Sequence, residues 1–101
     1  MPSGTATLDF GAFPGKSDAS VDVTGQASMV SGSLVEAWIR PVATSDHTAD
    51  EHMVESLKVI AGNIVAATGF TIYGFNTSEI IGPNDKGTRI YGQWTIAYAW
   101  I

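Results

Sequence analysis

The segment 94–101 alternates between large and mostly small side chains, and this pattern constrains the fold more than any other feature of the chain. Its even positions carry Trp, Ile, Tyr and Trp, whereas its odd positions carry Thr, Ala, Ala and Ile. A period of two is typical of a β-strand, because successive side chains leave opposite faces of the pleated backbone. Rings in such an apolar strand must be buried within a sheet or against a neighbouring subunit. The segment therefore predicts a compact all-β protein.

Similar alternation between turn-forming residues predicts the other strands. The segment 53–61 suits either a strand or a helix face, and its β-branched residues favour a strand. With that segment included, seven to eight short antiparallel strands indicate a β-sandwich or jelly-roll-like fold. The remaining strands are expected over 6–10, 19–24, 33–42, 63–67, 70–75 and 89–101, with a further strand or turn over 27–30.

One short helical turn is expected among these strands. Thr48 and Glu51 have the spacing of a capping box, in which the two side chains satisfy each other's backbone N–H groups. The turn should therefore lie near 48–53.

The size and charge of the chain restrict its architecture and its partners. A chain of 101 residues is long enough for one hydrophobic core and too short for two, so we expect a single domain over 1–101. Ten acidic residues against five basic ones give a net charge of −5, which makes nucleic acid a poor partner. No apolar run approaches the roughly 20 residues of a membrane helix, and the first residues lack a secretion signal. We therefore expect a protein made in the cytoplasm that does not enter a membrane.

The segment 46–52 is the only chemically dense part of the sequence, because it holds both histidines and three carboxylates. A divalent metal site would use His47, Asp50, Glu51 and His52. The histidines are five residues apart, which is the wrong spacing for a helical pair, and the chain has no cysteine. A solvated loop that caps a helical turn is the favoured interpretation, so we expect no metal and no cofactor. The two histidines could also titrate near pH 6.5 and adjust a subunit contact.

Catalysis is not expected from this sequence. A nucleophile would have to be Ser or Thr paired with one of two histidines, and the chain has neither a Gly-x-Ser-x-Gly turn nor a phosphate-binding loop. The aromatic residues Trp38, Trp94, Tyr98 and Trp100 could form a platform for stacking on sugars. Packing in the core or between subunits is the favoured role for these rings.

Several stretches of the chain resemble small virion structural proteins encoded in tailed-bacteriophage and prophage genomes, and together they span nearly its whole length. The resemblance implies a role in the virus particle, and no catalytic residues come with it. The stretches that carry it are Thr5–Gly15, Val35–Ile39, Asp50–His52, Ala61–Val65, Gly69–Tyr73 and Tyr91–Trp94.

Within a virion, the resemblance leaves two places for this chain. A capsid decoration or cement protein would bind the major capsid protein on the outer surface, often as a trimer or dimer, and acidity suits a surface turned away from the packaged genome. A tail-fibre-associated or receptor- and glycan-binding module is the alternative. A strand around Leu8 and Phe10 could pair with the sheet edge of a neighbour. The candidate interface residues are Leu8, Phe10, Phe13, Ile80, Ile81, Trp100 and Ile101.

Overall fold

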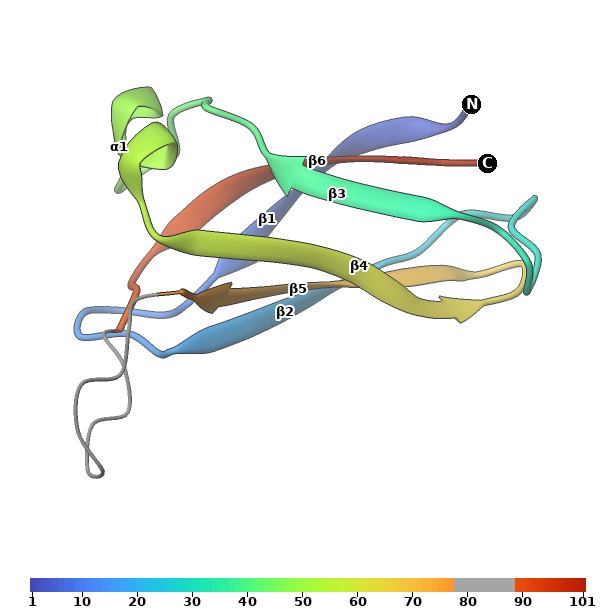
Figure 1. The fold of residues 1–101 in the computed structure, drawn as a ribbon, viewed down its shortest axis with the longest axis horizontal. Helices are drawn as coiled ribbons and strands as arrows, with labels where there is room; N and C mark the ends of the chain where they lie inside the picture. Colours follow the sequence, from blue (N-terminus) through green and yellow to red (C-terminus); the bar gives the residue numbers. More distant parts are fainter. Residues whose placement is uncertain (78–88) are drawn as a thin grey trace.

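The computed structural model describes residues 1–77 and 89–101, which form two three-stranded antiparallel sheets packed against each other. One sheet has the order β1-β6-β3 and the other has the order β2-β5-β4 (Figure 1). A sandwich is therefore confirmed. The elements are β1 (Ser3–Asp9), β2 (Asp18–Val23), β3 (Val35–Ile39), α1 (Ala49–Val54), β4 (Leu57–Val65), β5 (Gly69–Asn76) and β6 (Gln93–Trp100).

Strand β6 organises the core, because it lies between β1 and β3 and turns its large side chains toward the other sheet. Its register pairs Leu8 with Trp94 and Ala6 with Ile96, so these residues share the inner face. Phe70 and Ile72 on β5 pack against them from the second sheet. Trp94, Ile96, Tyr98 and Trp100 are all buried, as the alternation in this segment predicts.

The number of strands differs from the prediction, since six strands lie in the described parts of the chain instead of seven to eight. The expected strands 53–61 and 63–67 form one strand, β4, whose register shifts between Gly62 and Val65. Asn63 has a φ of 51°, so a local irregularity carries the strand across the point where we expected a turn. The prediction of a strand from residue 53 is also wrong, because α1 continues to Val54. The segment 27–30 contains a turn and no strand.

The candidate interface residues separate into three groups. Leu8, Phe10 and Trp100 are buried inside the chain itself, so their side chains pack in its own core. Each points to the inner face of its sheet, although β1 remains an edge strand. Phe13 and Ile101 are exposed. Ile80 and Ile81 lie outside the described residues.

No helix in the described residues has the length and apolar character needed to cross a lipid bilayer.

Candidate functional site

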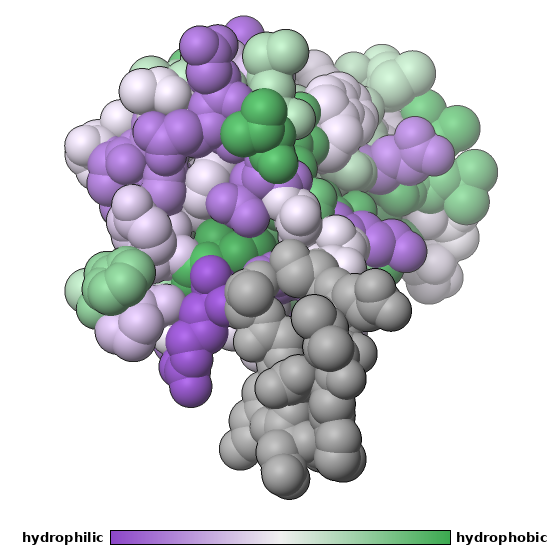
Figure 2. Space-filling view, turned by 60° about the vertical axis from the view of Figure 1, so that its left-hand side comes forward, coloured by the Kyte–Doolittle hydropathy of each residue, from purple (hydrophilic) through white to green (hydrophobic). Residues whose placement is uncertain are grey.

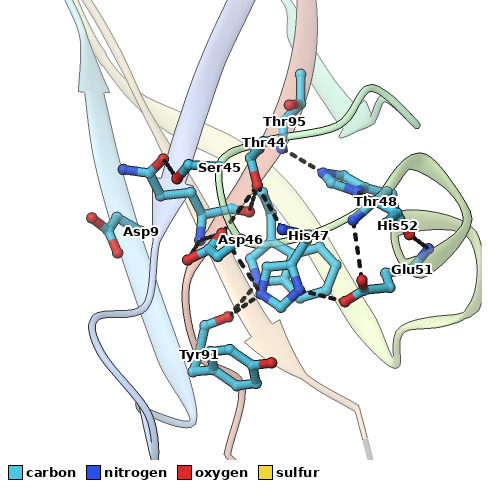
Figure 3. A network of polar contacts seen from close by, with 12 residues as sticks. Asp9, Thr44, Ser45, Asp46, His47, Thr48, Glu51, His52, Tyr91 and Thr95 are labelled. Carbon is cyan, nitrogen blue, oxygen red and sulfur yellow. Dashed lines mark hydrogen bonds and ion pairs between the residues drawn. The ribbon is translucent and has the colours of Figure 1, made fainter.

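The two histidines lie where α1 and the loop before it meet the start of β6 (Figure 3). Thr48 is the N-cap of α1, and its hydroxyl accepts a hydrogen bond from the backbone N–H of Glu51. Glu51 in turn accepts a hydrogen bond from the backbone N–H of Thr48, so the predicted capping box is confirmed. We call this arrangement of Asp46, His47, Glu51 and His52, with their partners at Tyr91 and on β6, the histidine network.

His47 is buried, and both of its ring nitrogens face hydrogen-bond acceptors. Nδ1 lies 2.6 Å from Oε2 of Glu51, and Nε2 lies 2.6 Å from the backbone carbonyl oxygen of Tyr91. A carbonyl and a carboxylate only accept, so both nitrogens donate and the ring is an imidazolium. The ring also stacks on Trp94, with 3.9 Å between the ring centroids and 20° between the planes. The protein therefore holds a cation between an indole face and two acceptors.

The electrostatics of the network agree with this protonation state. Burial disfavours the charged ring, but the hydrogen bonds to Glu51 and Tyr91 outweigh burial and raise the pKa of His47 above its ordinary value. The hydrogen bond from His47 lowers the pKa of Glu51. The pKa of Asp46 is lowered mainly by the hydrogen bond from the backbone N–H of Gln93.

His52 lies in the last turn of α1 and uses its two ring nitrogens differently. Its Nε2 lies 3.0 Å from the backbone nitrogen of Thr95, which can only donate, so Nε2 accepts. Its Nδ1 donates to the backbone carbonyl oxygen of Thr48 at 2.7 Å. His52 therefore joins α1 to β6 through one donating and one accepting ring nitrogen.

The arrangement leaves little capacity for binding a metal. The four ring nitrogens of His47 and His52 are all engaged in hydrogen bonds. Asp50 is exposed on α1 and forms no hydrogen bond or ion pair with another described residue. Within residues 1–77 and 89–101, no cluster of three or more histidine, cysteine or acidic side chains is placed to hold a metal ion. The structure thus brings His47 and Glu51 together and leaves Asp50 and His52 apart from them.

Comparison with protein-family models, curated proteins and solved structures finds no match for this chain.

Sequence reasoning missed the partners of the two histidines at Tyr91 and on β6. Tyr91 is 44 residues from His47, so its contribution depends on the pairing of strands. Gly92 carried a signal, because a glycine just before a strand of large residues indicates a close backbone approach. A Cβ atom at Gly92 would collide with the Asp46 carboxylate and with Nε2 of His47.

The four aromatic residues do not form the alternative platform for sugars. Trp94, Tyr98 and Trp100 are buried in the core, so they offer no open face to a sugar. Trp38 is 47% exposed on the outer face of its sheet. It stands apart from the other three because it alternates with the inward-facing residues of β3.

The tight packing around Gly92 can be tested by substitution with alanine. Gly92 and Gly25 share a φ of +78°, but nothing lies within 4 Å of a Cβ atom built at Gly25. Gly25→Ala is expected to cost about 1 kcal/mol, which is the penalty of the left-handed backbone alone. Gly92→Ala should cost about 1–3 kcal/mol more, because Asp46 and His47 must move. Urea unfolding of both variants measures the difference, and equal losses of stability would contradict this packing.

The histidine network also predicts how stability depends on pH. The pKa of His47 is raised in the folded protein, so its contribution is complete below about pH 6.5 and is lost as the pH rises through the folded value. The pKa values of Asp46 and Glu51 are lowered, so their contributions are complete above about pH 4.5 and are lost as the pH falls. Stabilisation by the network should therefore be greatest between about pH 4.5 and 6.5.

Glu51→Gln tests this dependence because glutamine preserves the capping box and removes the charge. Thermal unfolding from pH 4 to pH 9 should show a smaller loss of stability above neutrality in this variant than in the wild type. Asp50→Asn is the matched control, since Asp50 lies outside the network, and its profile should run parallel to that of the wild type. Coincident profiles for the wild type and Glu51→Gln would show that His47 does not depend on this partner.

Proposed function

We propose that this chain is a non-enzymatic bacteriophage structural protein that binds the outside of the capsid as a decoration protein. The alternative position is the tail. The resemblance to virion structural proteins supports a role in the particle. The histidine network supports a structural interpretation, because its groups are engaged in holding α1 against β6.

One surface feature carries the proposal of a docking role, and we call it the terminal patch. It consists of Met1, Leu34 and Ile101, which are all exposed and apolar. They border a hollow of about 240 Å³ that is also lined by Glu36, Ala99 and Trp100. Reciprocal backbone hydrogen bonds of 3.0 and 2.9 Å between Leu34 and Ile101 fix the patch to the end of the sheet. Rimmed apolar surface of this kind is typical of a protein-binding site.

The opposite end of the molecule, around α1, also has exposed apolar side chains, among them Met53 and Val54. In Figure 1 both termini lie at one end and α1 lies at the other. Figure 2 shows the face around the α1 end, where hydrophilic residues divide the apolar ones into small groups. In the proposed complex, the terminal patch faces the capsid protein and the α1 end faces the solvent.

Co-sedimentation with empty shells, assembled from the major capsid protein of the same genome, tests the proposal. The wild type should sediment with the shells, and Leu34→Asp should remain in the supernatant because a carboxylate would be buried in an apolar contact. Val54→Asp is the matched control, since Val54 is also exposed and apolar but lies on α1 at the other end. The proposal fails if the wild type does not bind shells, or if both variants bind as the wild type does.

Glycan binding is a second candidate function, and the position of Trp38 favours it. Trp38 pairs with Ala97, which pairs with Thr5 on the other side. The exposed indole therefore borders a shallow hollow of about 350 Å³ over small side chains, with the hydroxyl group of Ser3 nearby. Binding to a glycan array that disappears in Trp38→Ala, without binding to shells, would favour the tail position over decoration.

A further inference from the structure

The outer face of the sheet β2-β5-β4 carries an apolar strip between opposite charges. The strand register sets Asp18, Phe75 and Lys58 in one row across the three strands. Residues paired in this way point to the same face of a sheet. The position of Lys58 Nζ, 5.9 Å from the centre of the Phe75 ring, agrees with this arrangement.

The next row extends the apolar strip along the sheet. It contains Ser20 on β2, Tyr73 on β5 and Ile60 on β4. Tyr73 is 42% exposed and Ile60 is 44% exposed, so this face leaves large apolar side chains open to contact. The inward residues of the same strands, such as Ile72, are already packed in the core.

The charges on this face are separated by strand. Asp18 and Asp22 lie on the outer side of β2, and Lys58 lies on the outer side of β4. Two strand spacings place Asp18 about 10 Å from Lys58, with Phe75 between them. Neither residue forms an ion pair within the described part of the chain. The row therefore presents a negative charge, an aromatic ring and a positive charge in that order.

This order is self-complementary, and we propose that the face binds a second copy of the chain. A two-fold axis parallel to β5 would lay β2 over β4 of the second copy and would bring each Asp18 to Lys58 of that copy. The same operation would place Phe75 on Phe75 and Tyr73 on Tyr73 at the centre of the contact. An isologous contact of this kind closes as a dimer.

The charges also select this axis over the alternative one. A two-fold axis across the strands would lay β2 over β2 and would bring Asp18 toward Asp22 of the second copy. Like charges brought together at an interface oppose binding, so the charge pattern disfavours that arrangement.

The size of the face predicts a weak dimer. Three strands and three rows cover about 14 Å by 20 Å, which is smaller than a standard interface of about 800 Å² per partner. A contact of about 280 Å² per partner lies in the range of weak, transient interfaces, so we expect association mainly toward millimolar concentration. The contact does not include the terminal patch, and the inference does not rest on the virion role.

Charge reversal tests the dimer by sedimentation velocity of the full chain from micromolar to millimolar concentration. Asp18→Lys should weaken association at least about tenfold, because it sets lysine against lysine twice across the two-fold axis. Lys58→Asp should do the same by setting aspartate against aspartate. The double variant Asp18→Lys with Lys58→Asp should restore association, because it exchanges the charges within each pair.

Glu36→Lys is the matched control, because it makes the same change of charge on the outer face of the other sheet. It should leave association unchanged, and thermal unfolding should show that all the variants remain folded. A wild type that is monomeric at every concentration would overturn the inference. Single variants that associate as the wild type does, or a double variant that does not recover, would also overturn it. If the wild type self-associates but does not bind capsid shells, the result counts against the virion role and leaves the dimer intact.

Discussion

Trp94→Ala is expected to destabilise the protein by about 3–5 kcal/mol, which is enough to unfold much of a marginally stable domain. Trp94 is 1% exposed and lies at the centre of both the core and the histidine network. Its indole stacks on His47, meets the ring of His52 edge-on and donates a hydrogen bond to the carbonyl oxygen of Tyr91. Its removal leaves a cavity and uncovers a buried cation.

Chemical denaturation measures this effect, and two variants separate its causes. Trp94→Phe retains an aromatic ring but loses the indole N–H donor, so it should cost less than Trp94→Ala. Trp38→Ala removes an exposed indole from the same sheet and should cost about 1 kcal/mol or less. Equal losses for Trp94→Ala and Trp38→Ala would contradict the central place of Trp94 in the core.

Trp100→Ala should have a comparable effect, also about 3–5 kcal/mol, and the loss should be one of folding. Trp100 is 5% exposed within the single chain, and its indole N–H donates to Oε1 of Gln26 at 2.8 Å. Truncation therefore removes apolar packing and leaves a polar group without its partner. A change of this size should lower the midpoint of thermal unfolding at every protein concentration.

Ile101→Ala is the control at the adjacent position. Ile101 is 63% exposed, so this variant should remain within about 0.5 kcal/mol of the wild type. Trp100→Ala protein that folds with wild-type stability but does not associate would show that the ring belongs to an interface between copies.

Local patterns were sufficient to predict much of the fold. The alternation in 94–101 identified a strand and the face that it buries, because burial on one side of a sheet imposes a period of two. Thr48 and Glu51 predicted the start of α1, because a capping box depends only on residues three apart. The course of the chain after the helix was harder to predict. Gly62 and Asn63 are turn-forming residues, whereas β4 continues through them with a shift in register.

The histidine network could be predicted only in part. The density of charged residues around His47 marked the region, but the state of the ring depends on Tyr91 and Trp94. Those residues reach His47 through the packing of α1 on β6, and spacing along the chain does not encode that packing. The different hydrogen bonds of His47 and His52 likewise follow from backbone partners at Tyr91 and on β6, which a sequence pattern does not specify.

The place of β6 between β1 and β3 has a consequence for synthesis on the ribosome. β6 is the last of the six strands to emerge, yet it is the only strand that joins β1 to β3 in their sheet. β1 and β3 therefore remain unpaired in this sheet until β6 has been translated. Closing a sheet over such long sequence separations is slow. Folding of this half of the sandwich therefore waits for β6, and a nascent chain stalled before β6 would expose unpaired strands to aggregation.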